Sequence, residues 1–169
     1  MTSQRSGCPI NAAIEVLGDR WSLIVLRDIM FGDRRYFRTL QRESEEGIAS
    51  NILASRLRDL VAADLLTREN VGSGRRAAYS LTESAIQLVP VLAELGWWGL
   101  QHRPTTEPLR ARAKLLHEGG PNLWDDFMSE LRERHLDIPP QTRRPSVSEQ
   151  LDATCARAID VNTADPTPR

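Results

Sequence analysis

The chain has 169 residues, the length of one ordinary domain or of a small domain with an extension, and it can bury a hydrophobic core. Its 22 basic and 23 acidic residues give a formal net charge of −1, so any surface for a polyanion must be local. Hydrophobic residues at 40% and charged residues at 27% argue against a disordered, collagen-like or membrane protein. No apolar run approaches the roughly 20 residues that cross a bilayer, and we expect a cytoplasmic protein.

The cysteine and histidine positions argue against a metal site and against an enzyme. Cys8 and Cys155 are far apart and form no CxxC pair, which excludes a four-thiolate zinc site and disfavours a disulfide-stapled secreted fold. No histidine lies four residues from another; the three are His102, His117 and His135. The chain also contains no P-loop, dinucleotide-binding or nucleophile-elbow motif. We therefore expect neither enzymatic activity nor a cofactor.

The first part of the chain predicts three helices. Apolar residues at helical spacing predict a helix over residues 10–17 and a second helix, which Asp19 is placed to cap and which Gly32 ends. A third, short helix is expected over residues 35–42. Its expected inner face consists of Tyr36, Phe37 and Leu40.

The fourth predicted helix, over residues 50–63, has two distinct faces. Its core stripe consists of Leu53, Leu57, Leu60 and Val61. Its opposite face consists of Ser50, Asn51, Ala54, Ser55 and Arg58. Small side chains allow a helix to enter the major groove of DNA, where Asn and Ser can contact base edges and Arg can reach guanine or phosphate. The alternative is an ordinary amphipathic helix with a solvated face.

Two short strands, over residues 66–71 and 77–81, are predicted next, joined by a glycine-rich turn. Arg75 and Arg76 lie at the tip of this hairpin. Taken alone, such a tip is usually a solvated loop, but after a helix-turn-helix it is typical of a wing whose arginines enter the minor groove or contact the backbone. The order of helices and hairpin predicts a winged helix, mainly α with a small β-hairpin.

Basic residues are concentrated in the same part of the chain. Between residues 34 and 76, nine arginines outnumber six acidic residues, a local net charge of +3. Because cations that neutralise phosphates dominate affinity for nucleic acids, we expect double-stranded DNA as the partner. The candidate DNA-binding residues are Arg34, Arg35, Ser50, Asn51, Ser55, Arg58, Arg75 and Arg76. A winged helix that binds protein instead would need an apolar or acidic outer face over residues 50–58.

After the hairpin, the pattern predicts one long helix that Thr82 caps and that Pro90 kinks near residues 86–89. Its apolar stripe is wider than one small core needs, which favours a homodimer. The expected dimer residues are Ile14, Leu88, Leu92, Leu95 and Trp98. For the tandem pair Trp97-Trp98, core packing is favoured over a ligand-binding role, although large aromatic residues are also enriched at dimer contacts.

A set of short motifs follows in order between Cys8 and His102. They are Cys8-Pro9, the run from Leu17 to Asp28, Gly32 with Arg35-Tyr36-Phe37, Gly47-Ile48, the run from Arg56 to Leu60, Tyr79-Ser80-Leu81-Thr82, Pro90-Val91-Leu92 and Trp98-Gly99. In this order and spacing the chain resembles the HxlR-type transcriptional regulators, a subgroup of the MarR-like winged-helix proteins. Ala49 departs from the family pattern, which has a Ser cap there, and Asn51 stands where a basic residue is common.

The resemblance implies a transcriptional regulator that forms a dimer through its first helix and the helix after the wing. A two-fold dimer would bind a palindromic operator with half-sites about 34 Å apart. In part of this family the cysteine of the Cys-Pro pair responds to electrophiles or oxidants, so Cys8 is a candidate redox sensor. Arg5 and a helix start at Pro9 would favour its reactive thiolate. The alternative is a small apolar residue packed at the dimer contact.

The resemblance does not cover the end of the chain. We expect a DNA-binding and dimerisation domain over residues 8–103 and a helical extension over 104–138. The extension consists of two helices separated by Gly119-Gly120. Residues 139–169 are expected to form a linker, a short helix opened by a capping box at Ser146, and a disordered tail from Thr163. The effector, a small molecule or an electrophile, and the role of the extension are left open.

Overall fold

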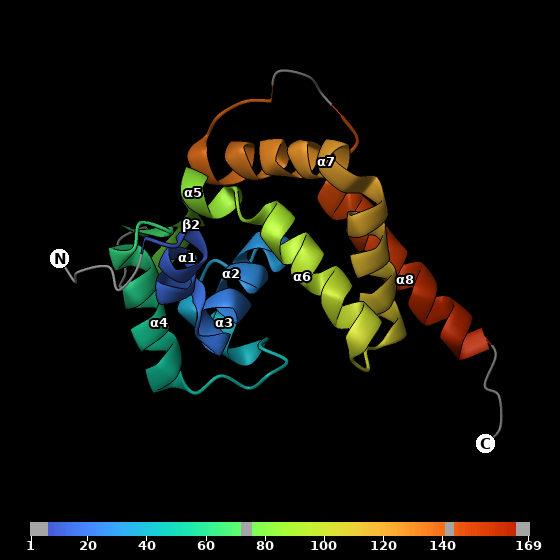
Figure 1. Ribbon diagram of the computed structural model, residues 1–169, viewed down its shortest axis with the longest axis horizontal. Helices are drawn as coiled ribbons and strands as arrows, with labels where there is room; N and C mark the ends of the chain where they lie inside the picture. Colours follow the sequence, from blue (N-terminus) through green and yellow to red (C-terminus); the bar gives the residue numbers. More distant parts are fainter. Residues whose placement is uncertain (1–6, 72–75, 141–143, 165–169) are drawn as a thin grey trace. The chain divides into compact units, whose positions relative to one another are not determined.

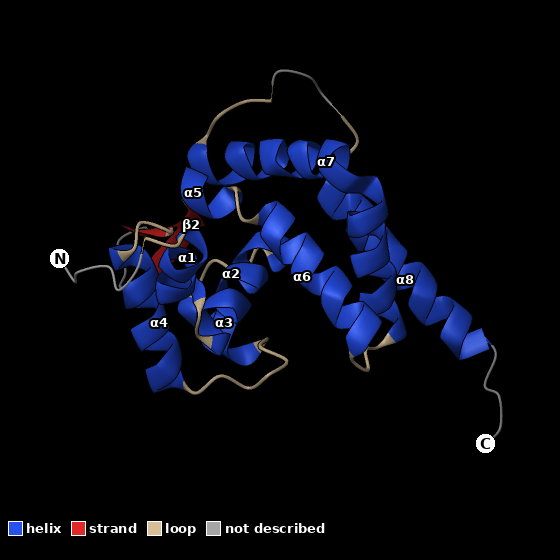
Figure 2. Cartoon of the chain, viewed as in Figure 1, coloured by secondary structure: helices blue, strands red, loops and turns tan. Residues whose placement is uncertain are grey.

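The structure is a computed structural model that describes residues 7–71, 76–140 and 144–164. The chain divides into two compact units, Met1–Ala85 and Ile86–Arg169, so that the expected domain over residues 8–103 extends across both. The described residues are mainly helical, and a two-stranded hairpin is their β-structure (Figures 1 and 2). The predicted fold class, a winged helix with a helical extension, is confirmed.

The first unit opens with α1 (Pro9–Leu17) and α2 (Arg20–Gly32). The carboxylate of Asp19 accepts hydrogen bonds from the amides of Trp21 at 2.9 Å and Ser22 at 3.0 Å, which confirms the predicted cap. Because α2 supplies core residues that contact both α4 and β2, it forms the centre of this unit. These core residues are Val25, Leu26, Ile29 and Met30.

Helix α3 (Phe37–Arg42) begins two residues later than the sequence predicts. The preceding residues are extended because they pair with the hairpin: Tyr36 bridges Ala78, and the Tyr79 amide donates to the Arg35 carbonyl at 2.8 Å. The prediction that Tyr36, Phe37 and Leu40 form the inner face of this helix is therefore wrong in part. Leu40 is buried, whereas Tyr36 and Phe37 are only half-buried.

Helix α4 (Ser50–Ala62) leads into the antiparallel strands β1 (Leu66–Asn70) and β2 (Ala77–Leu81). The core stripe of α4 is confirmed, except that Val61 is half-buried. Its fully buried residues are Leu53, Leu57 and Leu60. Strand β2 is buried along most of its length and β1 is largely exposed, because α2 covers β2.

The prediction of one long helix after the hairpin is wrong in one respect. The chain forms two helices there, α5 (Glu83–Ile86) and α6 (Val89–His102). Thr82 accepts a hydrogen bond from the Ala85 amide at 3.3 Å and caps α5, as predicted. Pro90 lies in the first turn of α6, where the missing N–H removes no helical hydrogen bond. A helix start at this position replaces the expected kink.

The second unit consists of α6, α7 (Glu107–Leu136) and α8 (Val147–Ala164), with α7 packed against both of the others. Helix α7 bends sharply at Gly120, whose φ of 55° and ψ of −154° lie outside the helical region (Figure 1). The predicted division at Gly119-Gly120 is thus confirmed. A Cβ atom at position 119 would lie 2.4 Å from the Leu123 side chain, so this position requires glycine. Across the bend, the Trp124 indole donates a hydrogen bond to the Leu116 carbonyl at 2.8 Å.

The start of α8 is held by Glu130 of α7. Its carboxylate accepts hydrogen bonds from the Val147 amide at 2.8 Å, the Ser146 hydroxyl at 3.1 Å and Arg134 at 2.7 Å. The Glu149 amide donates to Ser146 at 3.2 Å, as expected for the predicted cap. Helix α8 extends to Ala164, past the expected start of the tail at Thr163, and residues 165–169 lie outside the described part.

Glu130 gives a prediction about stability and pH. Burial by itself would raise the pKa of Glu130, but hydrogen bonds from Ser148 and Val147, together with Arg134, outweigh it and lower the pKa below its ordinary value. The stabilisation by the ionised carboxylate is therefore complete above the unfolded-state pKa of about 4.3 and is lost as the pH falls through the folded-state value. We expect Glu130→Gln to reduce the free energy of unfolding by about 1–3 kcal/mol at pH 7.

Urea unfolding followed by circular dichroism at pH 7 and at lower pH measures this difference. The gap between the variant and the wild type should shrink as the pH falls below about 4.3. Glu133→Gln is the matched control, because Glu133 is exposed on the same helix and its replacement should change the unfolding free energy by less than about 0.5 kcal/mol. Equal effects of the two substitutions at pH 7 would contradict the role of Glu130.

Candidate nucleic-acid interface

The outer face of α4 is polar and accessible. Ser50, Asn51, Ala54 and Arg58 are exposed and Ser55 is half-buried. Ala49 occupies the N-cap position, and its methyl group cannot accept a hydrogen bond from the first amides of the helix. Amides at such a helix start can donate to a phosphate group.

The charged groups of α4 are unequally available. Arg56 is half-buried and pairs with Asp19 at 3.3 Å and with Asp59 at 2.8 Å, so it connects α4 to the start of α2. Arg58 is exposed, and its Nε donates to the Ala54 carbonyl of its own helix at 3.3 Å. Among the residues that the structure describes, Arg58 has no carboxylate partner, and its terminal nitrogens can reach a ligand.

Arg34 and Arg35, two of the predicted DNA-binding residues, are engaged within the fold. Arg34 pairs with Asp28 at 3.2 Å and with Glu43 at 3.4 Å. Arg35 donates to the Ser80 hydroxyl and to the Tyr79 carbonyl of β2, the latter at 3.3 Å. Both arginines hold the segment before α3 against its neighbours, which leaves them less suited than Arg58 to contact a phosphate.

A buried ion network connects α2 to the turn before α4. Asp28 is only 4% exposed, and Arg27 donates to its carboxylate at 2.7 Å. Arg27 also makes two hydrogen bonds to Glu46, at 2.6 and 2.9 Å. These bonds lower the pKa of Glu46, against an opposing contribution from burial, and they raise the pKa of Arg27. Because Glu46 lies four residues before Ser50, this pairing fixes the turn from which α4 starts.

Sequence reasoning missed this network because its partners lie far apart in the chain. Arg27 and Glu46 are separated by 19 positions, a spacing that no helix or hairpin pattern produces. The available signal was weak: acidic residues before a DNA-binding helix would repel phosphates unless cations neutralise them. In this protein, arginines neutralise two acidic residues of the turn before α4, which are Glu43 and Glu46.

At the base of the hairpin, Arg76 lies over the Tyr36 ring, 4.0 Å from its centroid. Arg76 is exposed and, among the described residues, has no carboxylate partner. Arg38, exposed on α3, likewise has none in the part of the chain that is described. The other predicted wing residue, Arg75, lies outside the described residues.

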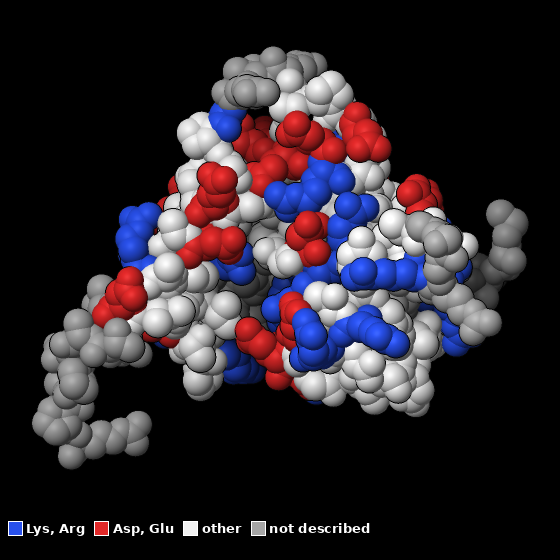
Figure 3. Space-filling model, turned by 180° about the vertical axis from the view of Figure 1, so that it is seen from behind, with Lys and Arg blue, Asp and Glu red and all other residues white. Residues whose placement is uncertain are grey.

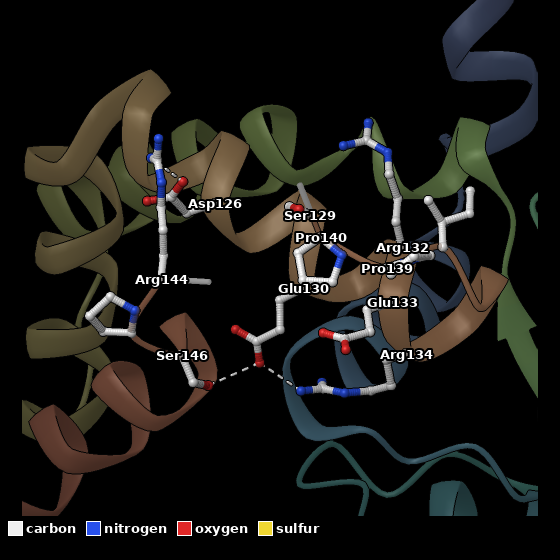
Figure 4. A pocket seen from close by; sticks show the side chains of 12 residues that line it. Asp126, Ser129, Glu130, Arg132, Glu133, Arg134, Pro139, Pro140, Arg144 and Ser146 are labelled. Atoms are coloured by element: carbon white, nitrogen blue, oxygen red, sulfur yellow. Dashed lines mark hydrogen bonds and ion pairs between the residues drawn. The ribbon is translucent and has the colours of Figure 1, made fainter. Parts of the chain in front are cut away.

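Many other charged side chains of the molecule lie close to groups of the opposite sign. On the face shown in Figure 3, arginine and acidic side chains lie next to one another over much of the surface. A hollow of about 730 Å³ in the second unit has the same mixed character (Figure 4), because Asp126 pairs with Arg144 and Glu130 pairs with Arg134 across its lining. Such compensated charge does not favour a polyanion.

The expected dimer residues lie on α1 and at the start and along the length of α6. Ile14, Leu95 and Trp98 are exposed at 58%, 47% and 53%. Leu88 and Leu92 are half-buried. Val91, which was not among the predicted residues, is exposed and lies four positions before Leu95 on the same face of α6. The accessible apolar stripe of α6 is therefore Val91, Leu95 and Trp98.

Cys8 is exposed at the N-cap position of α1, directly before Pro9 at the first helical position. Cys155 is half-buried on α8, and its Sγ donates to the Pro108 carbonyl at 3.3 Å. Arg5, expected to assist Cys8, lies outside the described residues. The two cysteines thus differ in their access to a reagent.

Within the described ranges, no group of three or more His, Cys, Asp and Glu side chains is arranged to hold a metal ion. Over the same ranges, no helix combines the length and the apolar character needed to span a membrane.

Comparison with known proteins gives a family match over residues 16–107, to the model described as HxlR-like helix-turn-helix. The uncharacterised HTH-type transcriptional regulator Rv3095 of Mycobacterium tuberculosis H37Rv is 38% identical over 109 residues, which cover 63% of this chain and 67% of the relative. The HTH-type transcriptional regulator YdeP of Bacillus subtilis 168, also uncharacterised, is 29% identical over 111 residues, which cover 64% of this chain and 84% of YdeP.

Two crystal structures have a similar fold. PA1607, described as a candidate transcription factor, superposes with a TM-score of 0.56 at 31% identity, over 63% of this chain and 73% of its own. A candidate regulator of the MarR family from Porphyromonas gingivalis W83 gives a TM-score of 0.51 at 21% identity, over 60% of this chain and 99% of its own. The likeness to the second protein concerns the fold alone.

Proposed function

Because the chain belongs to the HxlR-like helix-turn-helix family of transcriptional regulators, we propose that it binds a specific DNA operator through the outer face of α4. The observation that carries this proposal is the composition of that face, where Ser50, Asn51 and Arg58 are exposed above the buried leucine stripe. Asparagine reads adenine and arginine reads guanine in the major groove. In this role α4 is the recognition helix, and Arg76 contacts DNA from the base of the wing.

The alternative, a winged helix that binds a protein partner, receives less support. A protein-binding face would be apolar or acidic, whereas the exposed residues of α4 are small, hydrogen-bonding or cationic. The exposed acidic residue of α4, Asp59, is paired with Arg56. The family match supports a regulator that performs no catalysis, and the operator binding proposed here needs no cofactor.

Substitution of Arg58 tests DNA recognition. We expect Arg58→Ala to weaken binding to a duplex selected from a random-sequence pool by about 5- to 150-fold, because a direct base contact contributes about 1–3 kcal/mol of discrimination. Fluorescence anisotropy at fixed salt measures the affinity. The matched control is Arg157→Ala on α8, since Arg157 is also exposed and its Nε donates to a carbonyl four residues earlier, at 3.2 Å.

The control removes the same charge and should change the affinity by no more than about twofold, because the lost charge lies outside the proposed DNA contact. If Arg58→Ala binds as tightly as the wild type, while circular dichroism shows both proteins folded, the assignment of α4 as the recognition helix is wrong.

We further propose that two copies of the chain associate through α1 and the Val91, Leu95 and Trp98 stripe of α6. Large apolar side chains that are about half exposed in one copy would lose contact with water in a dimer. A two-fold dimer would present two recognition helices to half-sites about one DNA turn apart, which requires a palindromic operator.

The dimer is tested by Leu95→Glu. Burying one leucine contributes about 1.5–3 kcal/mol, so we expect the dimer dissociation constant to rise by at least tenfold. Sedimentation velocity measures it. Leu109→Glu on α7 is the matched control, because Leu109 is 45% exposed and Leu95 is 47% exposed. Dimers of undiminished affinity in Leu95→Glu would exclude this stripe as the interface.

Finally, we propose that an electrophile or oxidant regulates DNA binding through Cys8, whose exposure and position at the start of α1 support the idea. A modified Cys8 would lie beside the exposed Ile10 and Ile14 of the proposed dimer surface. A small-molecule effector is the second form of signal that this proposal allows.

Treatment with a quinone, which adds to thiolates, should lower the affinity of the wild type for the selected duplex. We expect Cys8→Ser to lose this response and Cys155→Ser to keep it, because the chain has two cysteines and Cys155 is the less exposed. The shift in anisotropy midpoint before and after treatment measures the effect. An identical response of Cys8→Ser and the wild type would remove Cys8 as the sensor.

A further inference from the structure

A hollow of about 770 Å³ lies on the first unit, between α3 and the base of the hairpin. Its lining includes the rings of Tyr36 and Phe37 and the side chains of Arg38, Arg42 and Arg76. This hollow is separate from the outer face of α4, and all of its lining residues belong to the described part of the chain.

The lining carries three guanidinium groups and no carboxylate. Arg42 is partly compensated, since it pairs with Glu43 at 2.9 Å. Arg38 and Arg76 have no carboxylate partner among the described residues. Two uncompensated cations that face one open hollow favour an anion as its occupant.

Tyr36 holds one of these cations in place. The Arg76 guanidinium carbon lies over the Tyr36 ring, 4.0 Å from its centroid, and a guanidinium held over a ring face keeps N–H groups available to a ligand. Both residues are fixed by their backbones. Tyr36 forms a β-bridge with Ala78, and its backbone carbonyl accepts a hydrogen bond from the Leu40 amide at 2.9 Å. The Arg76 backbone carbonyl accepts one from the Val71 amide at 2.9 Å.

We propose that this hollow binds one phosphodiester group of the DNA duplex, with Arg76 and Arg38 as its two cationic contacts and Tyr36 as the residue that positions Arg76. The site rests on the DNA-binding function proposed above and adds a backbone contact between α3 and the base of the wing. A backbone phosphate fits better than a base edge, because two arginines that line one hollow can bind a tetrahedral oxyanion through several donors.

The experiment compares salt dependence and single-phosphate substitution on the selected duplex. Affinity for DNA falls as salt rises, and each lost phosphate contact makes the slope of log affinity against log salt less steep by about 0.9. We therefore expect the slopes of Arg38→Ala and Arg76→Ala to be less steep than the wild-type slope by about that amount. Between 50 and 200 mM salt, each variant should then lose roughly three- to fourfold less affinity than the wild type loses. Arg157→Ala, which removes the same charge from α8, should keep the wild-type slope.

A scan that replaces one phosphate at a time by a neutral methylphosphonate should then find one position that weakens the wild type and leaves Arg38→Ala and Arg76→Ala unaffected. Tyr36→Phe keeps a ring beneath Arg76 and should retain sensitivity at that position. Tyr36→Leu removes the ring and should lose it, with circular dichroism confirming that the variant is folded. Rescue by phenylalanine separates positioning of Arg76 from a general structural role.

The proposal is overturned if both arginine variants keep the wild-type slope and methylphosphonate profile while Arg58→Ala still loses sequence-specific binding. In that outcome the proposed function stands and only the hollow is misassigned. If Arg58→Ala also binds as the wild type does, the proposed function itself fails. Saturable binding of inorganic phosphate to the DNA-free protein below about 1 mM, lost in Arg38→Ala, would overturn the backbone contact if the methylphosphonate profiles of the arginine variants also match that of the wild type, because the hollow would then serve a free anion.

Discussion

The carboxylate of Asp28 lies almost out of contact with water, and Arg27 and Arg34 both pair with its Oδ1 atom. A buried charge that loses its partner destabilises a protein by about 3–5 kcal/mol, so these pairings constrain every element that supplies one of them. Arg27 extends the constraint to Glu46 in the turn before α4, and Arg34 extends it to Glu43 after α3. The start of the proposed recognition helix is thereby fixed to the central helix α2.

The same network decides which arginines remain available to a ligand. Two arginines neutralise Asp28 and the acids of the turn, Arg35 holds β2, and Arg56 joins α4 to Asp19. The guanidinium groups without a carboxylate partner in the described part of this region include Arg38, Arg58 and Arg76. A near-neutral chain can thus present a cationic surface, because its acids are paired with arginines that serve the fold.

Local patterns in the sequence were sufficient for most elements of the first unit. Asp19 before an apolar stripe, the leucines of α4 and the strands around the glycine-rich turn are short-range signals, and the structure agrees with them. Two differences remain, of which the first arises from tertiary pairing and the second accompanies Pro90 in the first turn of α6. Residues 35–36 extend to join the hairpin instead of opening α3, and the helix after the hairpin ends at Ile86 and restarts at Val89.

The sequence by itself determined the family, the fold class and the polar outer face of α4, because these depend on residue order and on helical periodicity. Only the tertiary structure decided the roles of the individual arginines. Arg34, a predicted DNA-binding residue, is held by Asp28, whereas Arg38, which was not among the predicted residues, lines a hollow beside Arg76. The physical reason is that these roles depend on side-chain contacts in the folded chain, several of which, such as Arg27 with Glu46 and Arg76 with Tyr36, join residues 19 or more positions apart, a distance that no local pattern encodes.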